Sequence, residues 1–190
     1  MNVFDNNINL GLVMMMMRVP IHLTKPLFPI CPNKYQQRQI LTLMFIHKND
    51  QILLGLKKRG FGAGKWNGAG GKVEKDETIV QGAQRELKEE FGVSVSNPEQ
   101  VGILFFEFDE QYEKRLLECH VFKSKEYYGG EPEETEEMKP VWFNVNQLPF
   151  DKMWLDDQYW FKYMLANTKF AAHFVFSNFE TVVKHEIKEL

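Results

Sequence analysis

The segment GKVEKDETIVQGAQRELKEEFGV, residues 71–93, contains a full set of signals for one helix. Thr78 is a suitable N-cap, and Gln81 follows three residues later, at the spacing of a capping box. Gly92 is placed to end the helix in the left-handed conformation. The apolar side chains fall on one helical stripe that must face a core: Ile79, Val80, Ala83, Leu87 and Phe91.

Three glutamates border this stripe instead of lying opposite to it: Glu86, Glu89 and Glu90. Carboxylates within one helical turn repel one another, and Arg85 with Glu89 is the obvious i,i+4 pair that relieves this repulsion. A divalent cation would remove the conflict, and oxygen ligands favour Mg²⁺ or Mn²⁺ over zinc or copper. A charge run on a helix is more often a solvated face, so the pattern alone leaves both interpretations open.

The spacing within the segment is that of a known signature. It runs Gly, five residues, Glu, seven residues, then Arg-Glu-apolar-x-Glu-Glu-x-Gly-apolar. The matched positions are Gly71, Glu77, Arg85, Glu86, Leu87, Glu89, Glu90, Gly92 and Val93. If each of these residues occurs about one time in fifteen, a chance match in one chain is negligible. The segment therefore resembles the Nudix box, the signature of the Nudix hydrolases.

Further stretches resemble one branch of that family, the animal MutT homologues that hydrolyse oxidised purine nucleoside triphosphates. They are KKRGFGAGKWNGAGGKV at 57–73, EMKPVWF at 137–143 and PFDKMWLDDQYWF at 149–161, within a resemblance that covers residues 38–190. The resemblance implies an Mg²⁺-dependent enzyme, with Mn²⁺ as a substitute, that converts 8-oxo-dGTP and 2-hydroxy-dATP to the monophosphate and pyrophosphate. Such an enzyme cleanses the nucleotide pool and prevents mutagenic incorporation. The acidic loop 131–137 is longer than in the family, which leaves the position of Glu137 open.

The resemblance also implies roles for single residues. The implied metal ligands are the Gly70 carbonyl group, Glu86, Glu89, Glu90 and Glu137. Glu90 or Glu89 would orient the attacking water, and Arg85 would hold the carboxylates in place. The implied substrate contacts are Thr42, Lys57, Phe61, Asn67, Ala69, Gly70, Gly71, Lys72, Phe106, Trp154, Leu155, Asp156 and Asp157. By their places on a strand and on the second helix, Phe106, Phe108 and Trp160 are as compatible with a core as with a pocket wall.

The glycine-rich segment FGAGKWNGAGGKV, residues 61–73, matches no common phosphate-binding loop. It lacks the GKS or GKT of a Walker motif and the third glycine of a dinucleotide fingerprint. Gly68, Gly70 and Gly71 more plausibly allow the tight backbone path that brings a carbonyl group to a metal.

Asp156 and Asp157 stand at the start of a second predicted helix, residues 156–166, where an Asp can simply cap the helix. Two adjacent carboxylates beside Trp154 should not both ionise, because desolvation and mutual repulsion raise at least one pKa. A protonated Asp donates a hydrogen bond and an ionised one accepts, so the pair could match an oxidised guanine or an oxidised adenine. Capping and base recognition both remain open at this point.

Alternating apolar runs predict strands at residues 40–46, 52–56, 101–108, 115–122, 140–145, 172–177 and 181–190. The first two form a hairpin, and the last two form a closing pair. Mixed strands with two helices predict an α+β or three-layer α/β/α sandwich, which is the Nudix fold that the resemblance implies. We expect one Nudix hydrolase domain at residues 38–190. Residues 1–37, which are rich in Asn, Met and Pro, are expected to form a mobile extension that packs on nothing.

Composition limits the partners. The net charge of −3 gives no overall basic field, so we expect no nucleic-acid partner. The apolar run LGLVMMMM, residues 10–17, is too short to span a membrane. Cys31 and Cys119 have neither disulfide-framework nor zinc spacing, which favours a reducing compartment. We expect a cytoplasmic monomer that acts on small nucleotides, with nuclear or mitochondrial locations left open.

Other functions fit parts of the sequence. An ADP-ribose or dinucleoside-polyphosphate pyrophosphatase would keep the box, but the MWLDD segment at 153–157 argues against it. A non-catalytic nucleotide sensor would be expected to lack one of the box carboxylates, and none is missing. A decapping protein would need a basic groove, which this mildly acidic chain does not obviously supply.

Overall fold

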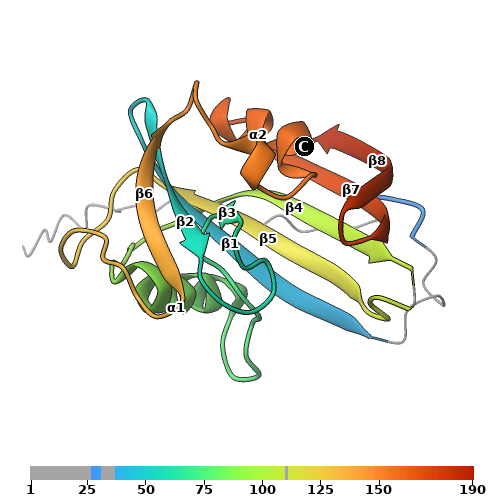
Figure 1. Ribbon diagram of the computed structural model, residues 1–190, viewed down its shortest axis with the longest axis horizontal. Helices are drawn as coiled ribbons and strands as arrows, with labels where there is room; N and C mark the ends of the chain where they lie inside the picture. The colour runs from blue at the N-terminus through green and yellow to red at the C-terminus, as the bar shows by residue number, and fades with distance from the viewer. Residues whose placement is uncertain (1–26, 31–36, 110) are drawn as a thin grey trace, which may run out of the picture.

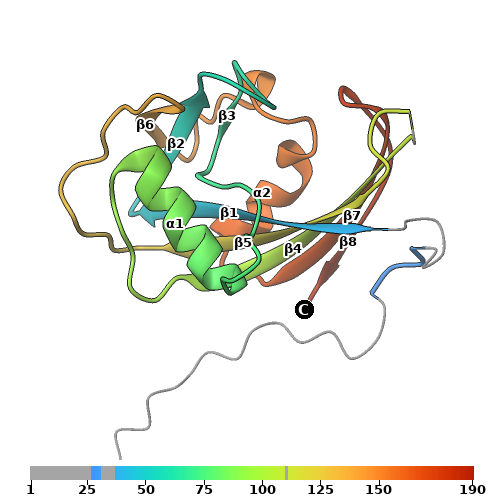
Figure 2. The same ribbon diagram turned by 90° about the horizontal axis from the view of Figure 1, so that it is seen from below.

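The computed structural model describes residues 27–30, 37–109 and 111–190. Its centre is one mixed β-sheet, with α1 (Ile79–Phe91) on one face and α2 (Asp157–Leu165) on the other (Figure 1, Figure 2). Separate apolar clusters lie between the sheet and each helix. The predicted three-layer α/β/α sandwich is therefore confirmed.

The strands are β1 (Arg38–Lys48), β2 (Gln51–Lys57), β3 (Trp66–Asn67), β4 (Glu99–Phe108), β5 (Leu116–Ser124), β6 (Met138–Asn144), β7 (Phe170–Asn178) and β8 (Thr181–Glu189). Their order in the sheet is β3-β2-β1-β5-β4-β7-β8, and β6 pairs with β2. β1 runs parallel to β5, β4 runs parallel to β7, and the other pairs are antiparallel. The predicted β1–β2 hairpin and the closing β7–β8 pair are both confirmed.

Strand β1 anchors both helices, because successive side chains point to opposite faces of a strand. Met44 and Ile46 belong to the cluster under α1, with Leu87 and Phe91. Phe45 lies on the other face, and its ring is 5.2 Å from that of Phe161 on α2. Strand β1 is thus held from both faces, and its backbone hydrogen bonds to Ala69 and Gly71 hold the glycine-rich segment beside it.

Helix α1 forms with the caps that its local signals predict, but Val80, which was expected to face the core, is 36% exposed in the first turn. The Thr78 hydroxyl accepts a hydrogen bond from the Gln81 N–H, and the Gln81 side chain accepts one from the Thr78 N–H. Gly92 ends the helix with φ 75°, a conformation that costs most side chains energy but not glycine. In the helix so capped, Glu86 and Glu90 face the glycine-rich segment, whereas Glu89 is exposed and pairs with Arg85.

Two short elements were not predicted: β3, and a 3₁₀ helix at Phe150–Lys152. Each is too short to show a sequence period. Asp156 occupies the N-cap position of α2, but its side chain makes no capping hydrogen bond. The capping interpretation of Asp156 is therefore wrong, and its carboxylate is available for other contacts.

Residues 1–37, here called the leader, were expected to pack on nothing, and this expectation is wrong for residues 27–30. The Phe28 side chain is only 4% exposed and packs with Ile103 and Phe105 of β4 on the outer face of the sheet. The Lys188 ammonium lies over the Phe28 ring and donates a hydrogen bond of 2.6 Å to the Leu27 carbonyl. The apolar side chains of Leu27, Phe28 and Ile30, which lie among the prolines of this segment, therefore indicated that the segment packs on the sheet.

The methionine run and Cys31 lie outside the described residues. In the described part of the chain, neither helix has the length and hydrophobicity required to cross a membrane.

Candidate functional site

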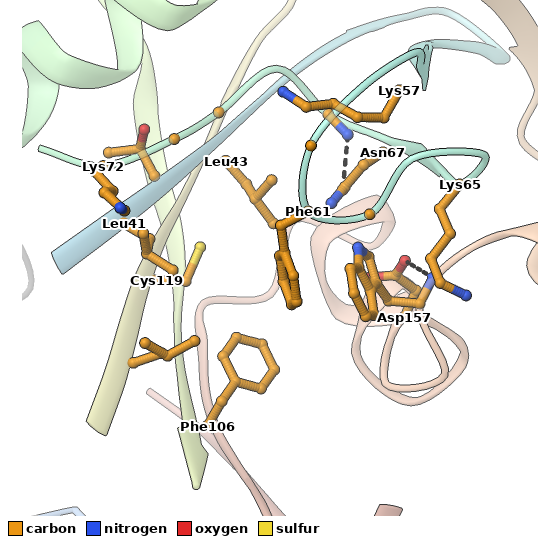
Figure 3. A pocket seen from close by; sticks show the side chains of 18 of the residues that line it. Leu41, Leu43, Lys57, Phe61, Lys65, Asn67, Lys72, Phe106, Cys119 and Asp157 are labelled. Carbon is orange, nitrogen blue, oxygen red and sulfur yellow. Dashed lines mark hydrogen bonds between the residues drawn. The ribbon is translucent and has the colours of Figure 1, made fainter. Parts of the chain in front are cut away.

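A cavity of about 490 Å³ opens between the sheet, the glycine-rich segment and the start of α2 (Figure 3). Its floor is apolar and comes from alternate residues of four strands: Leu41, Leu43, Phe106, Phe108, Leu117, Cys119 and Phe176. Two acidic groups lie at different parts of its wall, Glu137 near Lys57 and the pair Asp156 and Asp157 near Trp154. The cavity therefore combines an apolar chamber with two polar regions of distinct chemistry.

The first polar region of the cavity contains Lys57 and Glu137, and Lys57 links it to Glu90, which is buried and does not line the cavity. One carboxylate oxygen accepts a hydrogen bond of 2.6 Å from the Lys57 ammonium, and the other accepts one of 2.8 Å from the Gly70 N–H. Lys57 also lies 3.3 Å from Glu137, which is held by Arg59 at 2.6 Å. The last turn of α1 and the acidic loop thus converge on one lysine at the end of β2. The loop does bring Glu137 to the box glutamates, a position that the sequence left open.

Arg85 organises the remaining box carboxylates. Its guanidinium group donates to Glu77, to Glu86 at 2.9 Å and to Glu89 at 3.1 Å. It also donates to the Lys72 carbonyl, which ties α1 to the glycine-rich segment. Arg85 therefore holds carboxylates and backbone together and does not line the cavity.

Burial changes the proton affinity of two of these groups. It raises the pKa of Glu86 and of Glu90, and the nearby Arg85 and Lys57 offset only part of this effect. Burial alone would lower the pKa of Lys57, but its contacts with Glu90 and Glu137 outweigh that effect and raise it. Two carboxylates that have lost water and lie close together are costly unless positive charge compensates them.

The donor chemistry fits a hard divalent cation. Glu86, Glu89, Glu90 and Glu137 supply oxygen atoms, the donors that such ions prefer. A Cβ at Gly71 would lie 2.3 Å from Glu86 Oε1, so only glycine lets this carboxylate lie against the backbone. In the described residues no three of these side chains surround one point, because Lys57 and Arg85 pair with them. Gly70 contacts Glu90 through its N–H, whereas the sequence suggested a role for its carbonyl group.

The second polar region holds Asp156 and Asp157, which are 5% and 1% exposed. Asp156 accepts a hydrogen bond of 2.9 Å from the indole N–H of Trp160, and Asp157 accepts one of 3.1 Å from the backbone N–H of Trp154. Burial raises the pKa of both carboxyl groups, and repulsion from Asp156 raises that of Asp157 further. A carboxyl group of the pair that retained its proton would give the cavity a hydrogen-bond donor beside an acceptor.

Aromatic rings form the mouth of the cavity. The Phe61 ring stacks on Trp154 with 4.9 Å between centroids, although Phe61 itself is 63% exposed. The Lys65 ammonium lies 5.1 Å from the centre of the Trp154 ring. The Thr42 hydroxyl also lines the cavity, and in the described part of the chain it is the buried side-chain polar group that lacks a hydrogen-bond partner.

Most of the substrate contacts that the sequence suggested lie on the cavity wall: Thr42, Lys57, Phe61, Asn67, Gly70, Gly71, Lys72, Phe106, Trp154, Asp156 and Asp157. Two do not. Ala69 is fully buried in the core under α1, and Leu155 is 37% exposed and outside the wall. Of the three undecided aromatics, Phe106 and Phe108 line the cavity, and Trp160 is a core residue that reaches it only through Asp156.

Sequence reasoning missed several wall residues. Arg59 and Lys65 lie in or beside the glycine-rich loop and line the cavity. The positive charge of Arg59, which pairs with Glu137 of the acidic loop, was the sequence signal that could have identified it. Leu41, Leu43 and Cys119 share one face of neighbouring strands, but their meeting depends on the parallel β1–β5 register, in which Leu41 pairs with Cys119. Burial raises the pKa of the Cys119 thiol, so the neutral thiol is part of the apolar floor.

The family model described as the NUDIX domain matches residues 37–164. The chain is 45% identical over 152 residues to the oxidized purine nucleoside triphosphate hydrolases of Danio rerio and of Mus musculus. Each alignment covers 80% of this chain and 96% of the relative. The similarity therefore extends over nearly the full length of both relatives.

Solved structures agree with this similarity. A MutT protein from Bacillus halodurans superposes with a TM-score of 0.70 at 28% sequence identity, over 79% of this chain and 97% of that chain. A MutT NUDIX hydrolase from Burkholderia pseudomallei gives a TM-score of 0.54 at 26% identity, over 60% of this chain and 88% of that chain.

Proposed function

The chain belongs to the Nudix family of hydrolases, and we propose that it hydrolyses oxidised purine nucleoside triphosphates to the monophosphate and pyrophosphate. The names of its 45% identical relatives support this substrate class. The observation that carries the proposal is a single cavity that reaches from the buried Asp156 and Asp157 to Lys57 and Glu137. A purine triphosphate has the matching shape, with an aromatic base at one end and anionic oxygens at the other.

The base-binding end recognises an oxidised purine through the aspartate pair. Oxidation changes which ring atoms donate and which accept hydrogen bonds. Two adjacent carboxyl groups, one protonated and one ionised, present a donor and an acceptor in a buried site. The Trp154 ring supplies an apolar face for the base, and the Asn67 amide offers a further polar contact.

The phosphate end holds the reacting groups. Lys57, Arg59 and Lys72 line this part of the cavity and supply the positive charge that a polyanion needs. Water attacks the anhydride bond between the α- and β-phosphates: a new P–O bond forms, the bridging P–O bond breaks, and pyrophosphate leaves. We propose that Glu90 takes the proton from this water, and the upward shift of its pKa by burial supports this role because a general base needs sufficient proton affinity. The exposed Glu89 is the alternative base on the same helix face.

We propose Mg²⁺ as the divalent cation, held by Glu86, Glu89, Glu90 and Glu137. When bound, a cation of this kind neutralises phosphate oxygens and acidifies water. The arrangement of Glu86 against Gly71 and of Glu90 against the Gly70 N–H supports this assignment, because both carboxylates are oriented before any ligand binds. Arg85 is a positioning residue for Glu86 and Glu89.

Chromatographic separation of substrates and products for a panel of nucleotides tests the proposal, because pyrophosphate is a product of the triphosphates only. The panel contains 8-oxo-dGTP, 2-hydroxy-dATP, their unmodified counterparts, ADP-ribose and a diadenosine polyphosphate, each with Mg²⁺ or with a chelator. We expect the highest kcat/KM for the oxidised purine triphosphates and no turnover with the chelator. Preference for ADP-ribose or a dinucleotide would instead place the chain in another branch of the family, and no turnover of any compound would overturn the proposal.

A further inference from the structure

Phe179, in the turn between β7 and β8, lies at the centre of an aromatic cluster at the cavity mouth. Its ring centroid is 5.3 Å from that of Phe61, 5.1 Å from Phe108 and 5.7 Å from Tyr112. Phe61 in turn stacks on Trp154. One ring thus connects three separate segments: the glycine-rich loop, the β4–β5 turn and the β7–β8 turn, of which the two turns lie side by side in both overall views (Figure 1, Figure 2).

The Phe61 side chain depends strongly on this contact. It belongs to a loop whose glycines, Gly60, Gly62 and Gly64, all have positive φ angles between 75° and 85°. A Cβ at Gly60 or at Gly64 would meet nothing within 4 Å, so the side chains of other segments do not pack on the loop at these two points. The loop is held there by backbone hydrogen bonds, such as the one that the Gly64 N–H donates to the Lys57 carbonyl. Trp154 and Phe179 are the rings that the Phe61 ring contacts in the described structure.

Phe179 itself packs on the protein core, unlike the loop that carries Phe61. Phe179 is half-buried and packs on the main core cluster on the α2 side of the sheet. Phe108, one of its partners, is 6% exposed and lines the cavity. Phe179 therefore links a rigid strand to a loop side chain that has few other contacts.

We propose that Phe179 is a positioning residue that holds Phe61 against Trp154, so that the base-binding wall is complete before a nucleotide arrives. This inference rests on the proposed function, because the wall matters for catalysis only if a base binds there. The reacting phosphates lie at the other end of the cavity. Phe179 therefore acts on the binding of the base. Because the base is bound equally well in the ground state and in the transition state, loss of Phe179 should change KM but not kcat.

A double-mutant cycle tests the mechanism. Phe179→Ala should raise KM for 8-oxo-dGTP about three- to tenfold, the range expected for a lost aromatic pair, with kcat within about twofold of wild type. Phe61→Ala should raise KM at least as much. If Phe179 acts through Phe61, the double variant has the KM of Phe61→Ala alone. An unchanged KM for Phe179→Ala, or fold-changes that multiply in the double variant, would overturn the inference.

A second readout does not require turnover. Acrylamide quenching of tryptophan fluorescence in the free protein should increase in Phe179→Ala, because Phe61 no longer shields Trp154, and this increase should be absent when Trp154 is replaced by Phe. Val183→Ala, an exposed site on the same hairpin, is the control and should match wild type in both measurements. Unchanged quenching in Phe179→Ala would contradict the positioning role even if the proposed substrate class proved wrong. If Phe179→Ala increased quenching in a protein that hydrolyses none of the nucleotides, the proposed function would be wrong and the positioning role of Phe179 would stand.

Discussion

The Lys57 ammonium and the Glu90 carboxylate form a 2.6 Å ion pair in which the carboxylate is almost completely buried and the lysine is 19% exposed. The pair joins the end of β2 to the box helix, and it occupies the oxygen atoms that the proposed metal site requires. Lysine thus compensates a charge that would otherwise be buried without a partner. The same lysine lines the cavity, so it is positioned to contact phosphate when the carboxylate acquires another cation.

Removing this lysine should make stability depend on metal. Lys57→Met leaves the buried Glu90 charge uncompensated, so we expect the free energy of unfolding in a chelator to fall by about 3 kcal/mol. Mg²⁺ should restore part of this loss, because it binds only the folded site. Urea denaturation with chelator and with Mg²⁺ measures both values. Equal stability of variant and wild type in chelator would show that the pair contributes nothing to folding.

Glu90→Gln retains the shape of the side chain but removes its charge and its basicity. We expect kcat at saturating Mg²⁺ to fall by a factor on the order of 100 or more, with the fold intact. Glu134→Gln is the matched control, since Glu134 also pairs with a lysine but is half exposed on the acidic loop. Near wild-type kcat with unchanged Mg²⁺ dependence would rule out Glu90 as a metal ligand and as a base.

Asp157→Asn fixes one hydrogen-bond donor and one acceptor in the base-binding end. We expect a change in the ratio of kcat/KM for 8-oxo-dGTP to that for 2-hydroxy-dATP. The change should correspond to a free energy of ~1–3 kcal/mol, the cost of a lost buried hydrogen bond. Steady-state kinetics with both nucleotides measure this ratio, and Asp156→Asn provides the comparison. If both variants leave the ratio and each KM unchanged, base selection lies elsewhere.

The same pair should make stability fall with rising pH. Burial raises both pKa values above the ordinary value of 3.8, so the folded protein retains a proton at a pH where the unfolded chain has lost it. Unfolding then releases a proton, and its free energy decreases as the pH rises from that ordinary value through the raised pKa. Asp157→Asn removes one of these groups and should flatten this slope in urea denaturation at a series of pH values. A slope equal to that of wild type would show that the pair titrates normally.

Phe28 should contribute to stability although it lies far along the chain from the rest of its cluster. Phe28→Ala empties a buried position between Ile103, Phe105 and the Lys188 side chain, so we expect a loss of about 3 kcal/mol with kcat unchanged. Deletion of residues 1–34 should lower the melting temperature similarly. Tyr128→Ala, at an exposed position, is the control. No change in either variant would mean that the segment does not pack on the sheet in solution.

The parts of the fold that sequence predicted are those with local causes. The Thr78 and Gln81 cap, the Gly92 stop and the strand alternation involve residues within a few positions of one another. Contacts between distant segments were not predictable in this way. The parallel pairing of β1 with β5, the Lys57–Glu90 ion pair and the burial of Phe28 depend on which surfaces meet after folding. Ala69 illustrates the limit, since the motif gave its position in the chain but not the direction of its side chain.

Strand β4 uses both of its faces. Phe106 and Phe108 form the cavity floor, while Ile103 and Phe105 on the opposite face pack beneath Phe28. The irregular pairing with β5 between Gln100 and Gly102 sets which residues take which side. Inserting or deleting one residue after this point would exchange the two faces and place the cavity floor under the leader. Evolution of this chain can therefore lengthen the turns at either end of β4, but the spacing from Gly102 to Phe108 is not free to vary.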